Sequence, residues 1–281
     1  MTAYNRQKFI GEAIESVLAS TYTYFELIIV DDSSTDKTVA IAESYAAKDK
    51  RVQVYVNKKN LGQFENRNKA ASFAKGSYLK YVDSDDRIFP HMLQLMVDGM
   101  LAFPTAALGF CHTIGKCEES FPHQVDIIDA YRKHYFGGGL LYTGPIGLII
   151  KTDAFRSLGG FRSFGMPSDN HLSLRLAAIY PVVALEPELS FWRQHTEGQA
   201  SDQMDTLKNI FDHFLFNRDI LEDKNCPLNE KERGAALTSG RKNFSRGVLR
   251  WLKHKPSDVK LLKRLLKVNQ LDMNFILRNL L

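Results

Sequence analysis

The chain has 281 residues, which is enough for one α/β domain with a helical extension. Its apolar fraction of 44% and charged fraction of 25% are ordinary for a folded globular protein. The net charge of +5 is too small to indicate nucleic acid binding, so we expect no nucleic acid partner. We also expect no membrane span and no signal peptide, because the sequence holds no apolar segment of the required kind.

Helical and strand patterns alternate in the first half of the chain. Apolar residues spaced three and four apart predict helices at residues 7–19, 36–47, 63–75 and 90–103. Short apolar or alternating runs predict strands at residues 25–30, 52–56 and 77–82. This alternation is typical of a Rossmann-like, mostly parallel central sheet that is flanked by helices.

The pattern becomes less regular after about residue 104. Strands are predicted at 107–111, 146–150 and 189–194, and a helix is predicted at 169–179. Beyond residue 200 every pattern is helical. We therefore predict an α/β domain at 1–201, with halves at 1–103 and 104–201, and a C-terminal helical extension at 202–281.

Acidic residues follow two of the predicted strands. Asp31 and Asp32 come directly after the strand at 25–30, and Asp83 and Asp85 come after the strand at 77–82. Because the carboxyl ends of parallel strands meet at one edge of the sheet, the two clusters should lie on the same edge. A D-x-D pair there can share a hard divalent cation through its oxygens. Acidic turns that only cap helices give the same spacing, so both interpretations stay open.

A series of short segments runs in order through residues 2–201. The segments are Thr2-Ala3-Tyr4-Asn5-Arg6, Ile29-Val30-Asp31-Asp32-Ser33-Ser34-Thr35-Asp36, Asn60-Leu61-Gly62 with Arg67-Asn68, Gly76-Ser77-Tyr78-Leu79 before Asp83-Ser84-Asp85-Asp86, Leu158-Gly159-Gly160-Phe161, Ser168-Asp169, Glu186-Pro187-Glu188-Leu189 and Trp192-Arg193-Gln194-His195. In order and spacing this series resembles the family-2 glycosyltransferases of the GT-A fold. A series of this kind is more specific than any single segment.

The resemblance implies a donor site in residues 1–103. Tyr4 would stack on the donor base, and Asp32 would accept a hydrogen bond from the base's ring N–H. Arg67 would lie near the base or the phosphates. Asp83 would lie near the ribose and the metal, and Asp85 would bind Mn²⁺ or Mg²⁺ directly.

The resemblance also implies the reaction. Asp169 would be the general base that takes the proton from an acceptor hydroxyl, in one displacement that inverts the anomeric carbon. His195 would either approach the metal or diphosphate or be a loop histidine that closes over the site. The expected donor is a uridine diphosphate sugar, with guanosine and thymidine diphosphates open. The expected acceptor, bound by residues 104–201, is a sugar or lipid-linked sugar in surface polysaccharide or glycoconjugate biosynthesis.

Two positions depart from the family pattern. Ser168 stands where the family carries an acidic neighbour of the base, which leaves a catalytically inactive homologue as an alternative. The apolar strand that normally precedes the Thr2–Asn5 turn is missing, so we expect two neighbouring strands to lack a hydrogen-bonding partner. Asp86 could cap the next helix or help to orient the site, and of these two roles we predict the cap.

The C-terminal helices carry many basic residues. These are Arg241, Lys242, Arg246, Arg250, Lys253, Lys255, Lys260, Lys263, Arg264 and Lys267. Apolar residues such as Val248 and Trp251 are interleaved with them, so the helices could contact an anionic membrane as a peripheral surface. A solvated face on packed helices has the same pattern. The final apolar residues, among them Leu271, Phe275, Ile276, Leu280 and Leu281, could also form a homodimer contact.

Other classes of protein fit less of the chain. Three cysteines indicate a reducing, cytoplasmic compartment, and the group Cys111, His112, Cys117 and His123 lacks zinc-ligand spacing. A signalling receiver domain with Asp83 as phosphoacceptor remains an alternative, although it leaves Asp169 unexplained. A nucleotidyltransferase, a dinucleotide-binding dehydrogenase and a P-loop protein each need a glycine-rich phosphate loop that is absent.

Overall fold

The computed structural model describes residues 1–111, 120–165, 167–193, 206–255 and 258–280. The chain divides into two compact units. The first contains Met1–Ser163 and Leu172–Gln194, and the second contains Phe164–His171 and His195–Leu281. The predicted boundary at residue 201 lies outside the described residues and stays a prediction.

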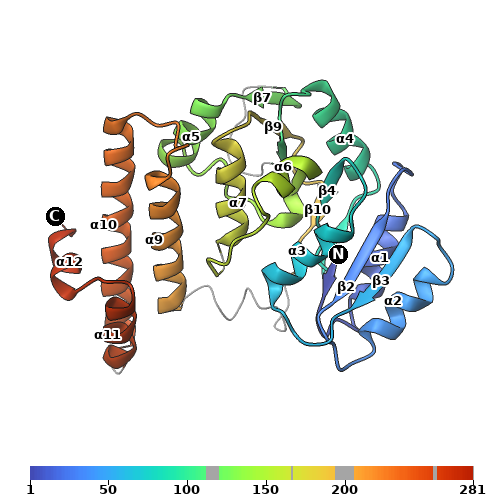
Figure 1. Cartoon of the computed structure of the whole chain (residues 1–281), viewed down its shortest axis with the longest axis horizontal. Coiled ribbons are helices and arrows are strands. Elements are labelled where there is room, and N and C mark those ends of the chain that lie inside the picture. Colours follow the sequence, from blue (N-terminus) through green and yellow to red (C-terminus); the bar gives the residue numbers. More distant parts are fainter. Residues whose placement is uncertain (112–119, 166, 194–205, 256–257, 281) are drawn as a thin grey trace. The chain divides into compact units, whose positions relative to one another are not determined.

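A three-stranded parallel sheet forms one part of the first unit (Figure 1). Its strands are β1 (Thr2–Ala3), β2 (Leu27–Asp31) and β3 (Val52–Val56), in that order. The two residues of β1 pair with Val30 and Asp31, at the carboxyl end of β2.

Helices cover both faces of this sheet. Helices α1 (Ile10–Leu18) and α2 (Thr38–Ala46) pack with Leu27 and Ile29 of β2 on one face. Helix α3 (Gln63–Phe73) places Ala70 against Ile28 and Val30 on the other face. Because successive residues of a strand point to opposite faces, an unbroken apolar run is what a strand buried on both sides requires.

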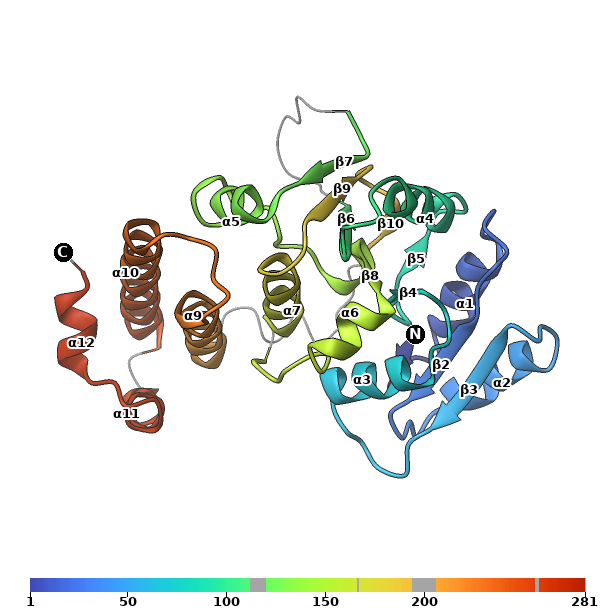
Figure 2. The same ribbon diagram turned by 45° about the horizontal axis from the view of Figure 1, so that its top comes forward.

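The second sheet of this unit has five strands in the order β4-β8-β6-β9-β7. They are β4 (Tyr78–Lys80), β6 (Leu108–Cys111), β7 (His123–Val125), β8 (Leu148–Lys151) and β9 (Val182–Leu185). Figure 2 shows β6, β8 and β9 side by side. Only β6 and β9 pair in parallel, so the parallel arrangement predicted for the centre holds for the three-stranded sheet and not for this mixed one.

Short connecting elements complete the first unit. They are a two-stranded ribbon of β5 (Arg87–Ile88) and β10 (Ser190–Phe191), helices α4 (Met92–Ala102), α5 (Ile127–Phe136) and α6 (Thr152–Ser157), and a 3-10 turn, η1 (Pro145–Gly147). Helix α7 (Ser168–Ala177) begins in the second unit and ends in the first. A parallel bridge between Thr2 and Asp83 joins the two sheets.

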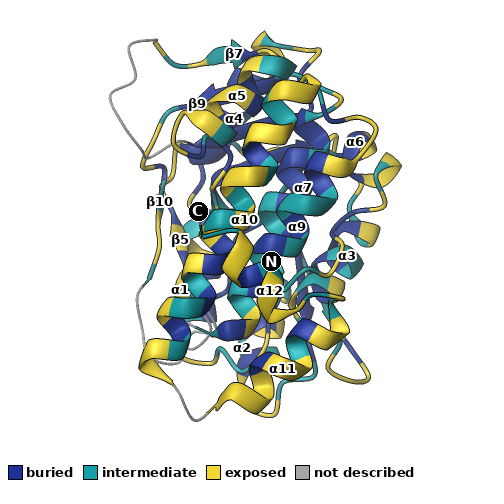
Figure 3. Cartoon of the chain, turned by 90° about the vertical axis from the view of Figure 1, so that its left-hand side faces the viewer, coloured by how far each residue is buried: buried dark blue, intermediate teal, exposed yellow. Residues whose placement is uncertain are grey.

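The second unit is helical after residue 205, as predicted. Its helices are α9 (Leu207–Glu222), α10 (Glu230–His254), α11 (Val259–Val268) and α12 (Met273–Arg278). They share a core that includes Phe211, Phe244, Val248 and Trp251. Figure 3 shows buried and exposed faces on these helices. Within the described ranges, no helix combines the length and apolarity needed to cross a bilayer.

Candidate active site

The carboxyl ends of β1, β2 and β4 carry the predicted donor residues. Tyr4 and Asn5 follow β1, Asp32 follows β2, and Asp83 lies beyond β4 beside Thr2. The loop after β1 is fastened to the loop after β2, since the Asn5 N–H donates to the Ser34 hydroxyl at 2.8 Å. Tyr4 remains 39% exposed, so its ring is available at this edge.

The Asp32 carboxylate is buried and accepts three hydrogen bonds from the protein. Its Oδ1 accepts from Asn57 Nδ2 at 2.7 Å and from the Leu61 N–H at 2.8 Å, and its Oδ2 accepts from the Gly62 N–H at 2.9 Å. Gly62 has a φ of 86°, which a side chain rarely tolerates. Asp32 therefore holds the Asn60–Gly62 turn in place, whatever it contributes to a ligand.

Asp83 is paired with a buried arginine. Arg67, which is 2% exposed, donates from Nη2 to Asp83 Oδ1 at 2.6 Å. Burial acts to raise the pKa of Asp83, but the charge and hydrogen bond of Arg67, with Lys80 and the N-terminal ammonium, hold that pKa below its usual value. Asp83 is therefore a carboxylate at neutral pH. Arg67 lies next to it, and the place of Arg67 near the base or the phosphates of a donor stays a prediction.

Asp85 also has a guanidinium partner. Arg6 donates from Nε to Asp85 Oδ2 at 3.0 Å, and both side chains are mostly shielded from solvent. Among the residues that the structure describes, no three His, Cys, Asp or Glu side chains are grouped to hold a metal. Asp83 and Asp85 still offer the hard oxygens that Mn²⁺ and Mg²⁺ prefer, so they fit a cation completed by diphosphate and water oxygens.

Asp86 has a role other than the predicted one. Helix α4 starts after His91 without a side-chain cap, so the predicted helix cap at Asp86 is wrong. Asp86 Oδ1 instead accepts the Arg193 N–H at 2.9 Å. Burial, together with the charges of Asp83 and Asp85, raises the pKa of Asp86 to about 7.

Arg193 links the strand β10 to the acidic edge. Its Nε donates to the Asp85 carbonyl oxygen at 3.0 Å, and its Nη2 contacts Glu12 at 2.6 Å. His195 itself lies outside the described residues.

The predicted base, Asp169, lies in the first turn of α7 in the second unit. Its Oδ1 accepts the Asn170 N–H at 2.9 Å, and the residue is partly buried. Ser168 is fully buried, accepts the Phe164 N–H at 2.8 Å and donates to the Gly165 carbonyl at 2.8 Å. Ser168 therefore closes the turn that leads into α7.

Sequence reasoning missed two parts of this site. Arg6 pairs with the Asp85 carboxylate and Arg193 donates to the Asp85 carbonyl oxygen, and no local sequence pattern predicts such partners 79 or 108 residues away. Asn57 could have been found, because it directly follows β3 and polar residues after strands face the ligand edge. Of the cysteine and histidine group, His112 and Cys117 lie outside the described residues, so the expectation that the group binds no zinc stays a prediction.

Comparison with known proteins shows which family this chain resembles in sequence. A model of the family described as glycosyl transferase family 2 matches residues 1–159. Glycosyltransferase GlyG of Streptococcus pneumoniae is 37% identical over 93 residues, which are 33% of this chain and 31% of GlyG. TuaG of Bacillus subtilis, assigned provisionally by its name to teichuronic acid biosynthesis, is 36% identical over 99 residues, 35% of this chain and 39% of TuaG. The matched part spans about a third of these curated relatives.

Solved structures share the fold. TarS residues 1–349 of S. aureus, in complex with UDP-GlcNAc, have a TM-score of 0.67 and 20% identity over 86% of this chain and 70% of that chain. The mannosyltransferase PcManGT of Pyrobaculum calidifontis, in complex with GDP-Man and Mn²⁺, has a TM-score of 0.66 and 16% identity over 92% of this chain and 73% of that chain. The receiver-domain alternative is therefore wrong. With a GT-A-like fold and a family match over more than half its length, this chain belongs to glycosyl transferase family 2.

Proposed function

We propose that this chain is an inverting glycosyltransferase that moves a sugar from a uridine diphosphate sugar to an acceptor hydroxyl. The observation that carries the proposal is the edge where Asp83 and Asp85 lie with Arg67 and Arg6 beyond the ends of β1 and β4. TarS has been solved with UDP-GlcNAc and PcManGT with GDP-Man, and both share the fold that carries this edge.

Each residue of the edge has a role in the proposal. Tyr4 stacks on the base, and Asp32 accepts from its ring N–H through the lone pair that its three protein hydrogen bonds leave over. Arg67 faces the phosphates. Asp83 and Asp85 hold Mn²⁺ or Mg²⁺, whose chemistry when bound is to neutralise charge on the departing diphosphate. For His195 both roles stay open, contact with the metal or diphosphate and closure of a loop over the site.

Asp169 is the proposed general base. Its carboxylate takes the proton from the acceptor hydroxyl while that oxygen attacks the anomeric carbon and the bond to the diphosphate oxygen breaks. A sugar or lipid-linked sugar is the proposed acceptor, in surface polysaccharide assembly on the cytoplasmic side of a membrane. The name of TuaG supports that setting.

Burial of apolar residues in the second unit limits which surfaces could contact a membrane or a second copy of the chain. Val248, Trp251 and Ile276 are buried in its own core, so a membrane contact would use the basic faces of α10 and α11. Leu271 and Phe275 also pack against that core, which leaves less apolar surface for a homodimer. Leu281 lies outside the described residues. Peripheral contact with anionic lipid is the partner we propose for this unit.

Two substitutions test the proposed function. Asp85→Ala should abolish the Mn²⁺-dependent rise in melting temperature that uridine diphosphate gives, because a ligand of the folded state stabilises by mass action. Asp169→Asn should keep that rise and lower transfer by roughly 10²–10⁴-fold. Normal transfer by Asp169→Asn would overturn the base assignment. No rise with uridine, guanosine or thymidine diphosphate would favour an inactive homologue.

A further inference from the structure

His171 is a buried side chain to which the proposed reaction gives no role. It lies in α7, two residues after Asp169, and it has no exposed surface. Its Nε2 is 2.9 Å from Oδ2 of Asp219, near the end of α9. Because a carboxylate accepts hydrogen bonds and donates none, the imidazole is the donor and carries a proton on Nε2.

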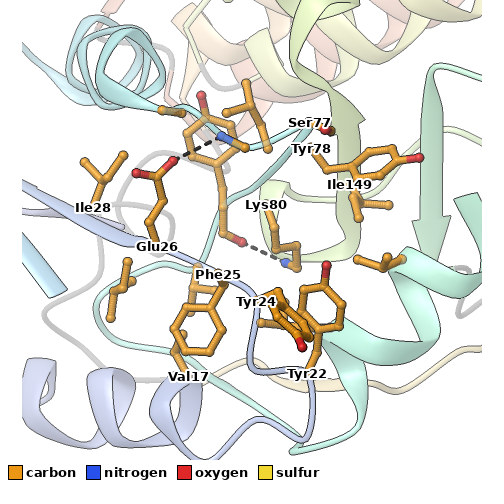
Figure 4. Close-up of a pocket in the computed structure, with 18 of the residues that line it drawn as sticks. Val17, Tyr22, Tyr24, Phe25, Glu26, Ile28, Ser77, Tyr78, Lys80 and Ile149 are labelled. Atoms are coloured by element: carbon orange, nitrogen blue, oxygen red, sulfur yellow. Dashed lines mark hydrogen bonds between the residues drawn. The ribbon is translucent and has the colours of Figure 1, made fainter. Parts of the chain in front are cut away.

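Lys80 of β4 is a contrasting case in the first unit. Its ammonium donates to the carbonyl oxygen of Tyr81 at 2.7 Å (Figure 4) and also to that of Ile146. Every residue offers a backbone carbonyl, so such bonds require no particular side chain as a partner. His171 instead depends on a carboxylate at one position of α9, and replacing Asp219 alone would remove that contact.

Aromatic rings fix the orientation of the His171 imidazole. The centroid of the Phe164 ring lies 4.3 Å from that of the imidazole, and Phe216 of α9 meets the imidazole edge-on at 6.5 Å. Phe216 is itself fully buried. Since a close-packed interior leaves little room for a ring to turn, the Nε2–H stays directed at Asp219.

Helix α9 also contacts the turn before Asp169. Gly165 has a φ of 68°, and a β-carbon at this position would overlap the Asp212 carboxylate. That carboxylate is held by Lys208, whose ammonium donates to Oδ2 at 2.6 Å. Asp212 and Asp219 are separated by about two turns of an α-helix, so they lie on one face of α9. This face therefore contacts the chain on both sides of Asp169.

The helical turn that contains Asp169 can transmit this contact. The His171 N–H donates to the Pro167 carbonyl at 2.9 Å, which closes the first turn of α7 around Asp169. The backbone of a hydrogen-bonded turn moves as a unit. An imidazole that is fixed on α9 therefore also fixes the orientation of Asp169.

We propose that His171 and Asp219 are positioning residues, which hold Asp169 in the orientation needed to take the proton from the acceptor hydroxyl. The inference rests on the proposed function, since it takes Asp169 as the general base. Residues Phe164–His171 and helix α9 belong to the same compact unit. The C-terminal helices therefore serve the chemical step, in addition to the proposed contact with lipid.

Asp219→Ala tests the proposal in the full chain. The Asp219 side chain is 42% exposed, so its removal opens no buried cavity. We expect kcat to fall by roughly 10–100-fold, because a misplacement of about 1 Å has an effect of that order. The KM for the donor should stay near that of the wild type, since Asp32, Asp83 and Asp85 lie in the first unit. Asp219→Glu keeps a carboxylate and should recover most of kcat.

The assay measures the release of uridine diphosphate. UDP-glucose, UDP-galactose and UDP-GlcNAc are supplied in turn with Mn²⁺ and with water or glucose as acceptor, and the donor that the wild type uses fastest is kept for the variants. Amide hydrogen exchange at residues 168–171 of the free protein gives a readout that needs no substrate. The exchange should be faster in Asp219→Ala than in the wild type or in Asp219→Glu.

Asp272→Ala is the matched control. Asp272 accepts the Phe275 N–H at 2.7 Å and caps α12, so its replacement weakens a helix of the same unit without removing either member of the His171–Asp219 pair. The control should lower the melting temperature. It should leave kcat and the exchange at residues 168–171 unchanged.

The possible outcomes separate this proposal from the proposed function. No release of uridine diphosphate by the wild type from any of the donors would refute the proposed function, and the positioning role with it. An active wild type whose kcat survives Asp219→Ala would refute the positioning role alone, as would an equal loss of kcat in Asp272→Ala or in Asp219→Glu. If the alanine variant does not fold, Asp219→Asn keeps the shape of the side chain and takes its place, with a loss of kcat at unchanged donor KM again expected.

Discussion

Replacing Asp32 by asparagine tests whether this carboxylate anchors the turn before α3. An asparagine oxygen can still accept from Asn57 and from the Leu61 N–H, as Oδ1 does now. Its amide nitrogen would then face the Gly62 N–H, where Oδ2 now accepts at 2.9 Å. One hydrogen bond to a charged acceptor is lost and two donors are brought together.

The expected loss of unfolding free energy is about 2–3 kcal/mol, because a hydrogen bond to a buried charge contributes about that much. For a protein of this size the loss corresponds to a melting temperature lower by roughly 3–6 °C. The assay is thermal and urea unfolding of the free protein, followed by circular dichroism without nucleotide. Asp32→Ala should cost more, since all three donors lose their acceptor.

Asp36→Asn is the matched control. Asp36 also accepts from three groups, namely the Gln7 N–H and the N–H and hydroxyl of Thr38, but it is only partly buried. Its replacement should cost on the order of 1 kcal/mol. If Asp32→Asn leaves the free protein as stable as Asp36→Asn does and changes only nucleotide binding, the anchoring role is refuted.

Two further predictions concern pH and packing. Burial lowers the pKa of His134 from 6.5 to about 4, so the unfolded chain takes up a proton first as the pH falls. The contribution of His134 to stability should be full above pH 6.5 and fall between pH 6.5 and 4 by on the order of 3 kcal/mol. The difference in unfolding free energy between the wild type and His134→Asn, which keeps an acceptor for the Leu141 N–H, should therefore change by this amount when urea unfolding is compared across that pH range. Gly109→Ala should destabilise by about 1–3 kcal/mol, because its methyl would lie 2.8 Å from Ile149 and 2.9 Å from Leu185 and Met100. Gly144→Ala meets nothing within 4 Å and should unfold like the wild type.

The spacing of apolar residues predicted those helices and strands in which the helical or alternating pattern continues along the whole element. The strand predicted at 52–56 coincides with β3, and the helix predicted at 90–103 contains α4. Strand β9 was missed, although Val182–Leu185 is a buried apolar run next to Pro181. Helix α5 was missed as well, because its apolar residues are broken by Asp129, Arg132 and Lys133.

The location of the site followed from topology, but its charge pairing did not. Asp32 and Asp83 could be placed together because both follow strands of one edge. The pairing of Asp83 with Arg67 and of Asp85 with Arg6 depends on how helix α3 and the first loop pack. A local pattern gives no information on contacts that only the folded chain creates.

Ser168 differs from the acidic residue expected at this position, and its hydrogen bonds in the turn before α7 give a structural reason for the difference. Its hydroxyl both accepts the Phe164 N–H and donates to the Gly165 carbonyl. A carboxylate in this buried place could accept from Phe164 but would repel the Gly165 carbonyl oxygen, because it has no proton to give. Serine is therefore suited to this turn in a way that the family's acidic residue is not. The substitution is explained by the geometry before α7, so it gives no reason to move the proposed base away from Asp169.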